Sequence, residues 1–321
     1  MTSVVVTGAA GFLGRHFVRH HLAQGHYVFG VDNLSAAGAR WPDELPIEHR
    51  FEADAGMFFT ADAGRERAYD IADIAYHFAA PVGGRVKIEG DPLFNADSLR
   101  LDSLFFRWAV KRAKLAVYPS SSAVYGVELQ GTGGGALSED MFHPSHLRWY
   151  APDEMYGFSK LAGEVLAWKS AGYGLNALCI RPFSGYGEGQ SLEYPVPSIC
   201  QRAIERQDPL TIWGSGSQTR DFIHVDDVVG ATIARIEKGV YGYQSMNIGS
   251  GHPITFTTVA SIAADLCGYT PEIVSDSSKP EGVKSRYAKT AHMRLFYKPT
   301  VTLKDGLTRV LEDRDAQNRT A

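Results

Sequence analysis

Tyr156 and Lys160 lie four residues apart in the segment Tyr156-Gly157-Phe158-Ser159-Lys160, which opens a predicted helix. Residues four apart share one face of a helix, so both side chains can reach the same pocket. A phenol has a pKa of about 10 and is a poor base at neutral pH. A neighbouring ammonium stabilises the phenolate and lowers that pKa, so the pair can remove the proton of an alcohol. This chemistry suits the oxidation of an alcohol to a ketone.

A serine-rich segment, residues 119–126, follows a predicted strand and supplies a third candidate group, Ser121. The hydroxyl of a serine there can bond the same substrate oxygen as the phenol and relay the proton. Taken alone, a Tyr-x-x-x-Lys pair is weak evidence, because such pairs arise by chance and usually form a solvated helix face. The pair gains weight from its position after a serine-rich strand end and after a glycine-rich turn.

The glycine-rich turn at the start of the chain predicts a dinucleotide site. It combines an apolar strand, a tight turn and the start of a helix in the residues Val4 to Val6, Gly8, Gly11, Phe12, Leu13 and Gly14. Glycines let the backbone approach a pyrophosphate, and the helix N-terminus offers it free N–H groups and a partial positive charge. The alternative interpretation is an ordinary strand–turn–helix unit without a ligand.

An acidic residue supports the dinucleotide interpretation. A second apolar strand, residues 27–31, ends in Asp32, 18 residues after Gly14. This is near the spacing of an acid that binds a ribose. A carboxylate accepts hydrogen bonds from both ribose hydroxyls and repels a 2′-phosphate, so the sequence favours NAD over NADP.

Composition excludes several classes of protein. The 321 residues are 44% apolar and carry a net charge of −4, with no long run of either sign. This gives no indication of a nucleic-acid groove or a polybasic membrane face. Cys179, Cys200 and Cys267 are far apart, which is not a metal-ligand pattern and favours buried thiols in a reducing compartment. Because no apolar run approaches the roughly 20 residues that span a bilayer and no basic region precedes the first strand, we expect a cytoplasmic protein.

Strand-like runs alternate with helical patterns through the first half of the chain. Residues 99–113 are expected to be a helix, and six strands are expected at residues 4–6, 27–31, 49–53, 74–78, 115–118 and 176–180. This alternation predicts an α/β fold with a Rossmann-type, doubly wound parallel sheet. Ligands of such sheets bind beyond the carboxyl ends of the strands. From Gly185 onward, prolines break the pattern and predict a smaller, mixed C-terminal substrate domain.

The order of these motifs resembles the extended short-chain dehydrogenase/reductase family, in particular its nucleotide-sugar epimerases and dehydratases. The matching segments lie at residues 7–14, 77–80, 120–126, 156–160, 181–183 and 220–227. The resemblance implies an NAD-binding domain at residues 1–184 and a mainly nucleotide-sugar-binding domain at residues 185–321, with the chain crossing back near residues 215–250. It also implies a homodimer to which each subunit contributes two helices.

The resemblance assigns roles to single positions. Tyr156 is the implied base, Lys160 its partner and Ser121 the third catalytic group. Besides Tyr156 and Lys160, the implied NAD contacts are Gly8, Gly11, Phe12, Leu13, Gly14, Asp32, Asn33, Asp54, Ala79, Ala80 and Pro182. The implied substrate contacts are Val82, Ser122, Ser184, Arg220 and Arg286, and no metal is implied. The two arginines suit a diphosphate, because a guanidinium fork binds two oxygens at once.

Departures from the family pattern narrow the activity. Ser122 and Ala123 stand where sugar 4,6-dehydratases carry an Asp-Glu pair, and Ala123 stands where 3,5-epimerases and related epimerase–reductases carry a cysteine. The loop Val82-Gly83-Gly84 nevertheless resembles the loop of those 3,5-epimerases. Because catalytic side chains outweigh a loop, we expect an NAD-dependent epimerase that acts at C4 of a nucleotide-sugar through a transient 4-keto sugar. The alternatives are a nucleotide 4-keto-sugar reductase or a 3,5-epimerase/reductase, and, less favoured, a 4,6-dehydratase or a non-catalytic NAD-binding sensor.

The connection at residues 127–155 is longer than the family pattern has. It holds a run of glycines, Gly133 to Gly135, and the polar and aromatic residues His143, His146, Trp149 and Tyr150. Two interpretations stay open, a lid over the sugar and a surface insertion. Its histidines could be acid–base groups, although loop histidines are usually solvated. Arg85 or Ser122 could contact the carboxylate of a uronic acid, so the sequence leaves the charge of the sugar open.

Overall fold

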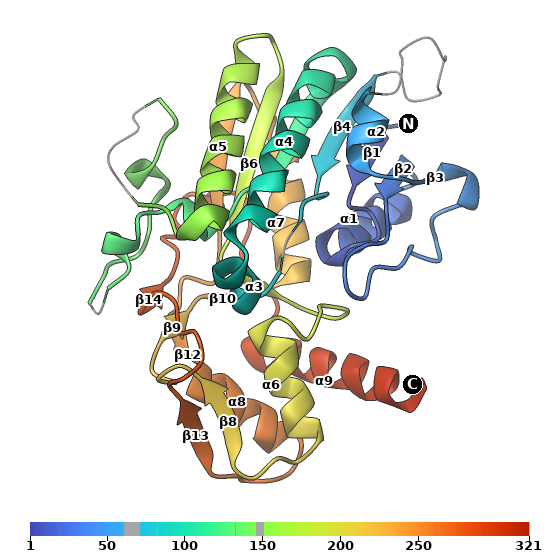
Figure 1. Ribbon diagram of the computed structural model, residues 1–321. Coiled ribbons are helices and arrows are strands. Elements are labelled where there is room, and N and C mark those ends of the chain that lie inside the picture. Colours follow the sequence, from blue (N-terminus) through green and yellow to red (C-terminus); the bar gives the residue numbers. More distant parts are fainter. Residues whose placement is uncertain (61–70, 82, 132, 146–150, 321) are drawn as a thin grey trace.

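The centre of the protein is a seven-stranded parallel sheet in the order β11-β6-β5-β4-β1-β2-β3 (Figure 1). The computed structural model describes residues 1–60, 71–81, 83–131, 133–145 and 151–320. The strands are β1 (Ser3–Thr7), β2 (Tyr27–Asp32), β3 (Arg50–Glu52), β4 (Ala72–His77), β5 (Ala113–Pro119), β6 (Asn176–Pro182) and β11 (Tyr243–Ile248). The first six are those predicted from the sequence, and β11 joins the sheet edge from the second half of the chain by pairing with β6.

Helices cover both faces of the sheet, as a doubly wound fold requires. One face carries α1 (Phe12–Ala23) and α7 (Val225–Glu237), and the other carries α2 (Ala55–Thr60), α4 (Pro92–Arg112) and α5 (Glu154–Ala171). Strand β1 shows the alternation that two covered faces demand, because Val4 and Val6 join the core on the α1 side and Val5 joins the core on the α4 side. The predicted fold class is confirmed.

Helix α4 begins seven residues before the predicted start at residue 99. Asp91 is its N-cap, and the carboxylate of Asp91 accepts a hydrogen bond of 3.1 Å from the backbone N–H of Phe94. Proline at the first helical position is well tolerated, because the N–H it lacks has no partner inside the helix. The Asp-Pro pair was therefore a readable start signal, which the prediction from hydrophobic spacing missed.

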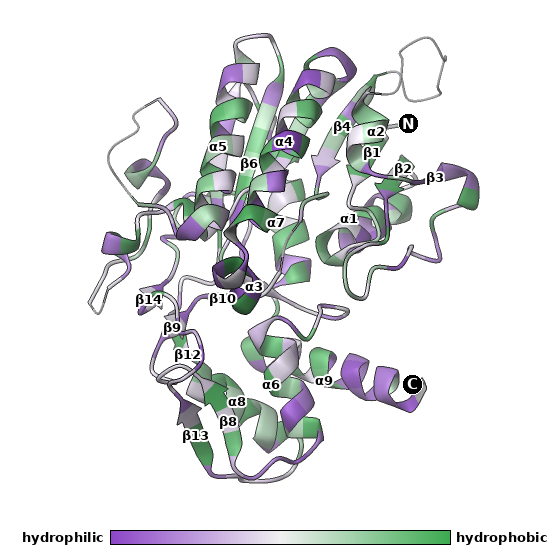
Figure 2. Cartoon of the chain, in the orientation of Figure 1, coloured by the Kyte–Doolittle hydropathy of each residue, from purple (hydrophilic) through white to green (hydrophobic). Residues whose placement is uncertain are grey.

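The second half of the chain forms a smaller, mixed lobe below the sheet in Figure 1. Its elements are α6 (Pro195–Ile204), α8 (Phe256–Leu266), α9 (Leu303–Thr320) and the short strands β7 (Ser184–Tyr186), β8 (Leu210–Trp213), β9 (Thr219–Arg220), β10 (Phe222–His224), β12 (Ile254–Thr255), β13 (Ile273–Asp276) and β14 (Ser285–Arg286). The lobe has its own core, which includes Ile199, Ile212, Phe256 and Leu307. Figure 2 shows this core as apolar faces on α8 and β8, and a polar C-terminal end of α9.

The helices of the described ranges include none that is long and apolar enough to cross a membrane.

A glycine sets the distance between α5 and the sheet. The hydroxyl of Tyr118, on β5, donates to Asp102 of α4 at 2.8 Å, and it passes directly beneath Gly163 of α5. The second oxygen of Asp102 lies 3.2 Å from His77 at the end of β4. A side chain at Gly163 would overlap the Tyr118 hydroxyl, so this glycine allows the buried Tyr118–Asp102–His77 network to form.

Replacing Gly163 with alanine is expected to destabilise the fold by about 1–3 kcal/mol, because the new methyl group overlaps the Tyr118 hydroxyl. In an open helical position, the same change usually stabilises a protein by up to about 1 kcal/mol. Gly90, in α3 (Arg85–Gly90), is the matched control, because nothing lies within 4 Å of the position of its added Cβ. Urea unfolding of both variants checks the sign; equal effects at the two positions would contradict the packing described.

Candidate active site

A cavity of about 320 Å³ separates the carboxyl edge of the sheet from the smaller lobe. Both halves of the chain line it, and its wall includes the predicted site residues Ser121, Ser122, Tyr156, Ser184, Arg220 and Arg286. Its volume falls within the usual range for small-molecule sites. The structure thus brings together catalytic and substrate candidates that are up to 165 positions apart in sequence (121 to 286).

The turn between β1 and α1 has the backbone geometry of a pyrophosphate cradle. Gly8 adopts φ of +70°, and its N–H donates to Val31 O at 2.8 Å. A Cβ at Gly14 would overlap the carbonyl oxygen of Gly8, so the first turn of α1 packs directly on the loop. Gly11 is the N-cap of α1 and provides no side-chain cap, so the N–H groups at Phe12 and Leu13 face the space where an anion would lie.

Asp32 is held at the end of β2 by backbone donors. Its two carboxylate oxygens accept hydrogen bonds from the N–H of Ala10 (3.0 Å) and the N–H of Leu34 (2.7 Å). Burial raises the pKa of Asp32 above its ordinary value, although these N–H groups act in the opposite direction. Each carboxylate oxygen keeps a further lone pair, so the group is suited to bind the hydroxyls of a ribose.

The other predicted cofactor contacts lie around the same sheet edge. Asn33 follows Asp32, and its amide oxygen accepts hydrogen bonds from the N–H and hydroxyl of Ser35. Asp54 follows β3, accepts a 2.9 Å bond from Gly56 N–H and lies 3.6 Å from Arg100. Of the remaining three, Ala79 and Ala80 lie two and three residues after the end of β4, and Pro182 is the last residue of β6.

The proposed catalytic side chains come from the end of β5 and the start of α5. Ser121 caps the short helix η2 (Ser122–Val124), and its Oγ accepts a 3.1 Å bond from Ala123 N–H. Lys160 is only 4% exposed, with its Nζ 6.0 Å from the centre of the Tyr156 ring and 5.2 Å from that of Tyr118. Ser121 and Tyr156 face one cavity, whereas Lys160 is not among the residues that line it and lies buried beside the Tyr156 ring.

A buried ion pair supports these elements from below. Arg181 of β6 and Glu164 of α5 are both fully buried, with the guanidinium Nη2 2.6 Å from a carboxylate oxygen. The carboxylate also accepts the hydroxyls of Ser120 and Tyr243, and Arg181 donates to the hydroxyl of Tyr125 at 2.9 Å. Burial opposes the charge on Arg181, but Glu164 outweighs it and raises the pKa of the guanidinium.

Sequence reasoning missed Glu164, Tyr194 and Asp153. Glu164 could have been found, because it lies four residues after Lys160 and therefore on the same inward face of α5. Tyr194 lines the cavity, and burial followed by the proximity of Tyr156 raises its pKa. Nothing in the sequence around Tyr194 or Asp153 indicated that either faces the cavity.

Asp153 joins two arginines across the cavity. Its carboxylate oxygens lie 2.8 and 2.9 Å from Nη1 of Arg85, and one lies 2.6 Å from Nη2 of Arg286. Arg220, beside them, donates to the carbonyl oxygens of Val283 and Glu281. Burial, and then repulsion from Arg286 and Arg85, lowers the pKa of Arg220 to about 9. The cavity is therefore cationic and ready to bind an anion.

The long connection after Ser121 packs beside the cavity. Leu137 forms a β-bridge with Ala288, and Phe142 joins a small core beneath the ion pair. Of the described part of residues 127–155, Asp153 alone lines the cavity, which favours the surface-insertion interpretation over the lid for that part. Val82, His146, Trp149 and Tyr150 lie outside the described residues.

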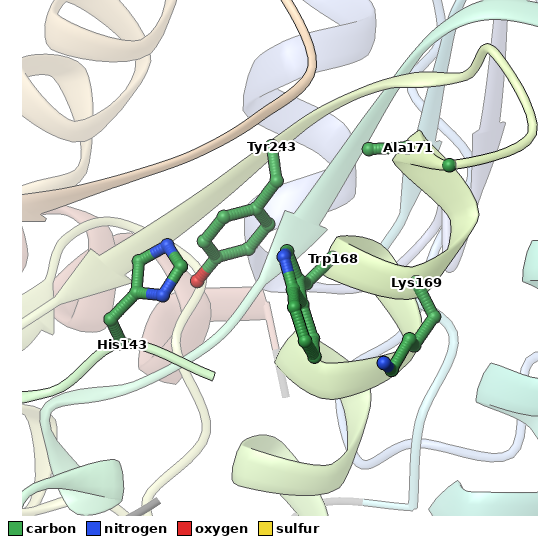
Figure 3. Close-up of a pocket in the computed structure, with 6 residues that line it drawn as sticks. His143, Trp168, Lys169, Ala171 and Tyr243 are labelled. Carbon is green, nitrogen blue, oxygen red and sulfur yellow. The ribbon is translucent and has the colours of Figure 1, made fainter. Parts of the chain in front are cut away.

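His143 lies away from the proposed chemistry. It lines a separate hollow of about 410 Å³ with Trp168, Lys169 and Tyr243 (Figure 3). Its ring meets that of Tyr243 edge-on, with ring centres 5.3 Å apart, and it is not among the residues that line the cavity of Ser121 and Tyr156. The acid–base hypothesis for His143 is therefore wrong for the cavity that holds Tyr156.

Residues 4–249 match the sequence profile of the NAD dependent epimerase/dehydratase family, and the chain belongs to this family. The chain is 30% identical to a UDP-glucose 4-epimerase of Mycolicibacterium smegmatis over 316 residues, which cover 96% of this chain and 97% of that protein. It is 29% identical to a dTDP-4-dehydro-6-deoxy-D-allose reductase of a Streptomyces species over 91% of this chain and 89% of the relative.

A solved structure with the same fold carries ligands. The structure of MoeE5 in complex with UDP-glucose and NAD is 27% identical, covers 98% of this chain and 99% of its own, and superposes with a TM-score of 0.79. MoeE5 has also been solved with UDP-glucuronic acid and NAD. Relatives thus include both an epimerase and a reductase, so family membership indicates the type of enzyme but not which reaction it catalyses.

Replacing Glu164 with alanine is expected to destabilise the protein by about 3–5 kcal/mol, because it leaves the buried Arg181 guanidinium without its counter-charge. The matched control is Asp315→Ala, which removes a solvent-exposed partner of Arg319 in α9 and is expected to cost less than about 1 kcal/mol. Denaturant unfolding measures both. Similar small losses in the two variants would show that the ion pair is not a structural anchor.

Proposed function

We propose that this protein is an NAD-dependent nucleotide-sugar epimerase that acts at C4 by transient oxidation to a 4-keto sugar. The observation that carries the proposal is the placement of Ser121 and Tyr156 in one cavity with Arg220 and Arg286. An acid–base pair thus faces the same space as a diphosphate-binding pair. Family membership, together with the relative that is a UDP-glucose 4-epimerase, supports the proposal.

Residues 1–184 supply the proposed NAD site. The backbone at Gly8, Gly11 and Gly14 would hold the pyrophosphate, and Asp32 would bind the adenosine ribose. The contacts proposed around them are Phe12, Leu13, Asn33, Asp54, Ala79, Ala80, Lys160 and Pro182. The complex of MoeE5 with NAD supports this assignment. When bound, NAD supplies a reversible acceptor for a hydride from carbon.

Three side chains contribute to proton transfer at the sugar hydroxyl. Tyr156 accepts the proton as the carbon is oxidised and returns it when the ketone is reduced. The ammonium of Lys160 stabilises the negative charge on the phenol oxygen. Ser121 donates a hydrogen bond to the same sugar oxygen and holds it between the two groups.

Residues 185–321 contribute most of the proposed nucleotide-sugar site. Arg220 and Arg286 would bind the diphosphate, with Ser122 and Ser184 on the sugar side. The burial of both guanidinium groups strengthens their attraction to an anion, because little water screens it. Val82, proposed as a further contact, lies outside the described residues.

The side chains favour epimerisation over the rival reactions. Ser122 and Ala123 offer no acid pair for the elimination of water and no cysteine for proton exchange at C3 or C5. The Streptomyces relative makes a 4-keto-sugar reductase the second candidate. A reductase would gain from NADPH, and Asp32 opposes its 2′-phosphate, so an epimerase with no net redox change is preferred.

We also propose a cytoplasmic homodimer formed through α4 and α5. These helices lie side by side on one face of the sheet (Figure 1). Their exposed apolar side chains include Leu93, 78% exposed, and Phe158, 47% exposed, which a second subunit would cover. The cysteines Cys179, Cys200 and Cys267 are free thiols, as suits a reducing compartment.

Replacing Tyr156 with phenylalanine is expected to lower kcat by about 100-fold or more, because the variant has no group to take the sugar proton. Retained NAD, measured after acid release, should stay at the wild-type level. Tyr173→Phe is the matched control, since Tyr173 is 79% exposed just beyond α5, and it should leave kcat unchanged. Wild-type turnover in the Tyr156 variant would refute the assigned base.

Turnover in deuterated water distinguishes the reaction types. The protein is incubated with UDP-, GDP-, CDP- and dTDP-sugars, and products are analysed by chromatography and mass spectrometry. A 4-epimerase leaves every carbon-bound hydrogen unlabelled, because the hydrogen taken from C4 returns to C4. Deuterium at C3 or C5 would instead identify a 3,5-epimerase or a dehydratase, and a single reduced product that requires added coenzyme would identify a reductase.

A further inference from the structure

Asp153 determines how much positive charge the cavity can offer a substrate. It is 5% exposed and precedes α5, three residues before Tyr156. Arg85 reaches it from the start of α3, and Arg286 reaches it from β14 in the smaller lobe. One carboxylate therefore occupies cations from both walls of the cavity.

The positive charge of this cluster suits a diphosphate and leaves little for a further anion. The three guanidinium groups of Arg85, Arg220 and Arg286 stand against two carboxylates, Asp153 and Glu89, because Nε of Arg85 also pairs with Glu89 of α3 at 2.5 Å. The cluster therefore keeps an excess of one positive charge. A diphosphate that links a nucleoside to a sugar carries one negative charge on each phosphate. Binding it would use the whole excess of positive charge and leave no cation for a further anionic group.

The other charged side chains of the lining do not change this count. Arg202 donates its guanidinium to the backbone oxygens of Ser198 and Thr211. Glu281 pairs with Lys284 at 2.9 Å, and Glu193 is exposed to solvent. Burial alone would raise the pKa of Asp153, but Arg286 and Arg85 outweigh burial and hold that pKa below its ordinary value. Asp153 is therefore a fixed negative charge at neutral pH.

We propose that Asp153 is a specificity-determining residue that makes the cavity select nucleotide-linked sugars without a carboxylate. By pairing with Arg85, the cation nearest to it on the wall that carries Ser121 and Tyr156, Asp153 removes the partner that the carboxylate of a uronic acid would need. It also repels that carboxylate directly. The inference rests on the proposed function, since it concerns the sugar end of the same site.

The test compares two ligands that differ only in charge at C6, UDP-glucose and UDP-glucuronate, by titration calorimetry on the NAD-containing protein. The wild type is expected to bind UDP-glucose at least about tenfold more tightly. Asp153→Asn frees Nη1 of Arg85, whose Nε stays paired with Glu89, and removes the repulsion by Asp153, so it should improve the relative affinity for UDP-glucuronate by about tenfold or more. Adding Arg85→Met to that variant should abolish the gain. The wild-type comparison alone tests the inference if the Asn variant does not fold.

Glu193→Gln is the matched control, because it removes an exposed carboxylate from the same lining and should change the affinity ratio by less than about threefold. Equal or tighter binding of UDP-glucuronate by the wild type overturns the inference, and so does an unchanged ratio in a folded Asp153→Asn variant. Both results leave the proposed function intact, since both ligands still bind. If neither ligand binds the wild type at millimolar concentration, the proposed function fails and the inference fails with it.

Discussion

The buried ion pair between Arg181 and Glu164 is the constraint on which the site depends. Neither side chain touches solvent, so the pair is stable only if every polar atom around it is satisfied. The hydroxyls of Ser120, Tyr125 and Tyr243 meet this requirement, and they tie the end of β5, the helix α5 and the edge strand β11 to one point. Because Ser121 follows Ser120 and Tyr156 lies on α5, the same contacts fix both proposed catalytic groups relative to each other.

A second electrostatic arrangement faces the cavity, where Asp153 pairs with two arginines. The guanidinium groups of Arg85 and Arg286 are paired through Asp153 rather than left free, which keeps their side chains in place before a ligand arrives. Gln130, from the long connection, also bonds Arg286 and extends this support to the smaller lobe. The long connection thus contributes to the cavity by holding Arg286 in position, although most of its described residues do not reach the cavity.

The amino-acid sequence was sufficient to predict those features whose signal comes from residues that are near one another in the chain. Apolar runs such as Val4 to Val6 indicated the strands, and Gly8, Gly14 and Asp32 indicated the turn because each is required by the backbone or by the ligand at that place. Helical spacing placed Tyr156 and Lys160 on one face of α5. The structure places these residues where the motif order suggested, although their roles stay predictions until they are measured.

Contacts between distant residues could not be predicted. Arg85 and Asp153 are 68 positions apart, and no period or spacing links them. The same holds for the packing of Leu137 against Ala288, which fixes an insertion that looked equally suited to a lid. The most direct measurement of the central claim is a structure of the protein with NAD and a nucleotide-sugar bound. The account predicts that Ser121 Oγ and Tyr156 Oη both lie about 2.6–3.2 Å from one sugar oxygen; a sugar whose oxygens contact neither group would contradict it.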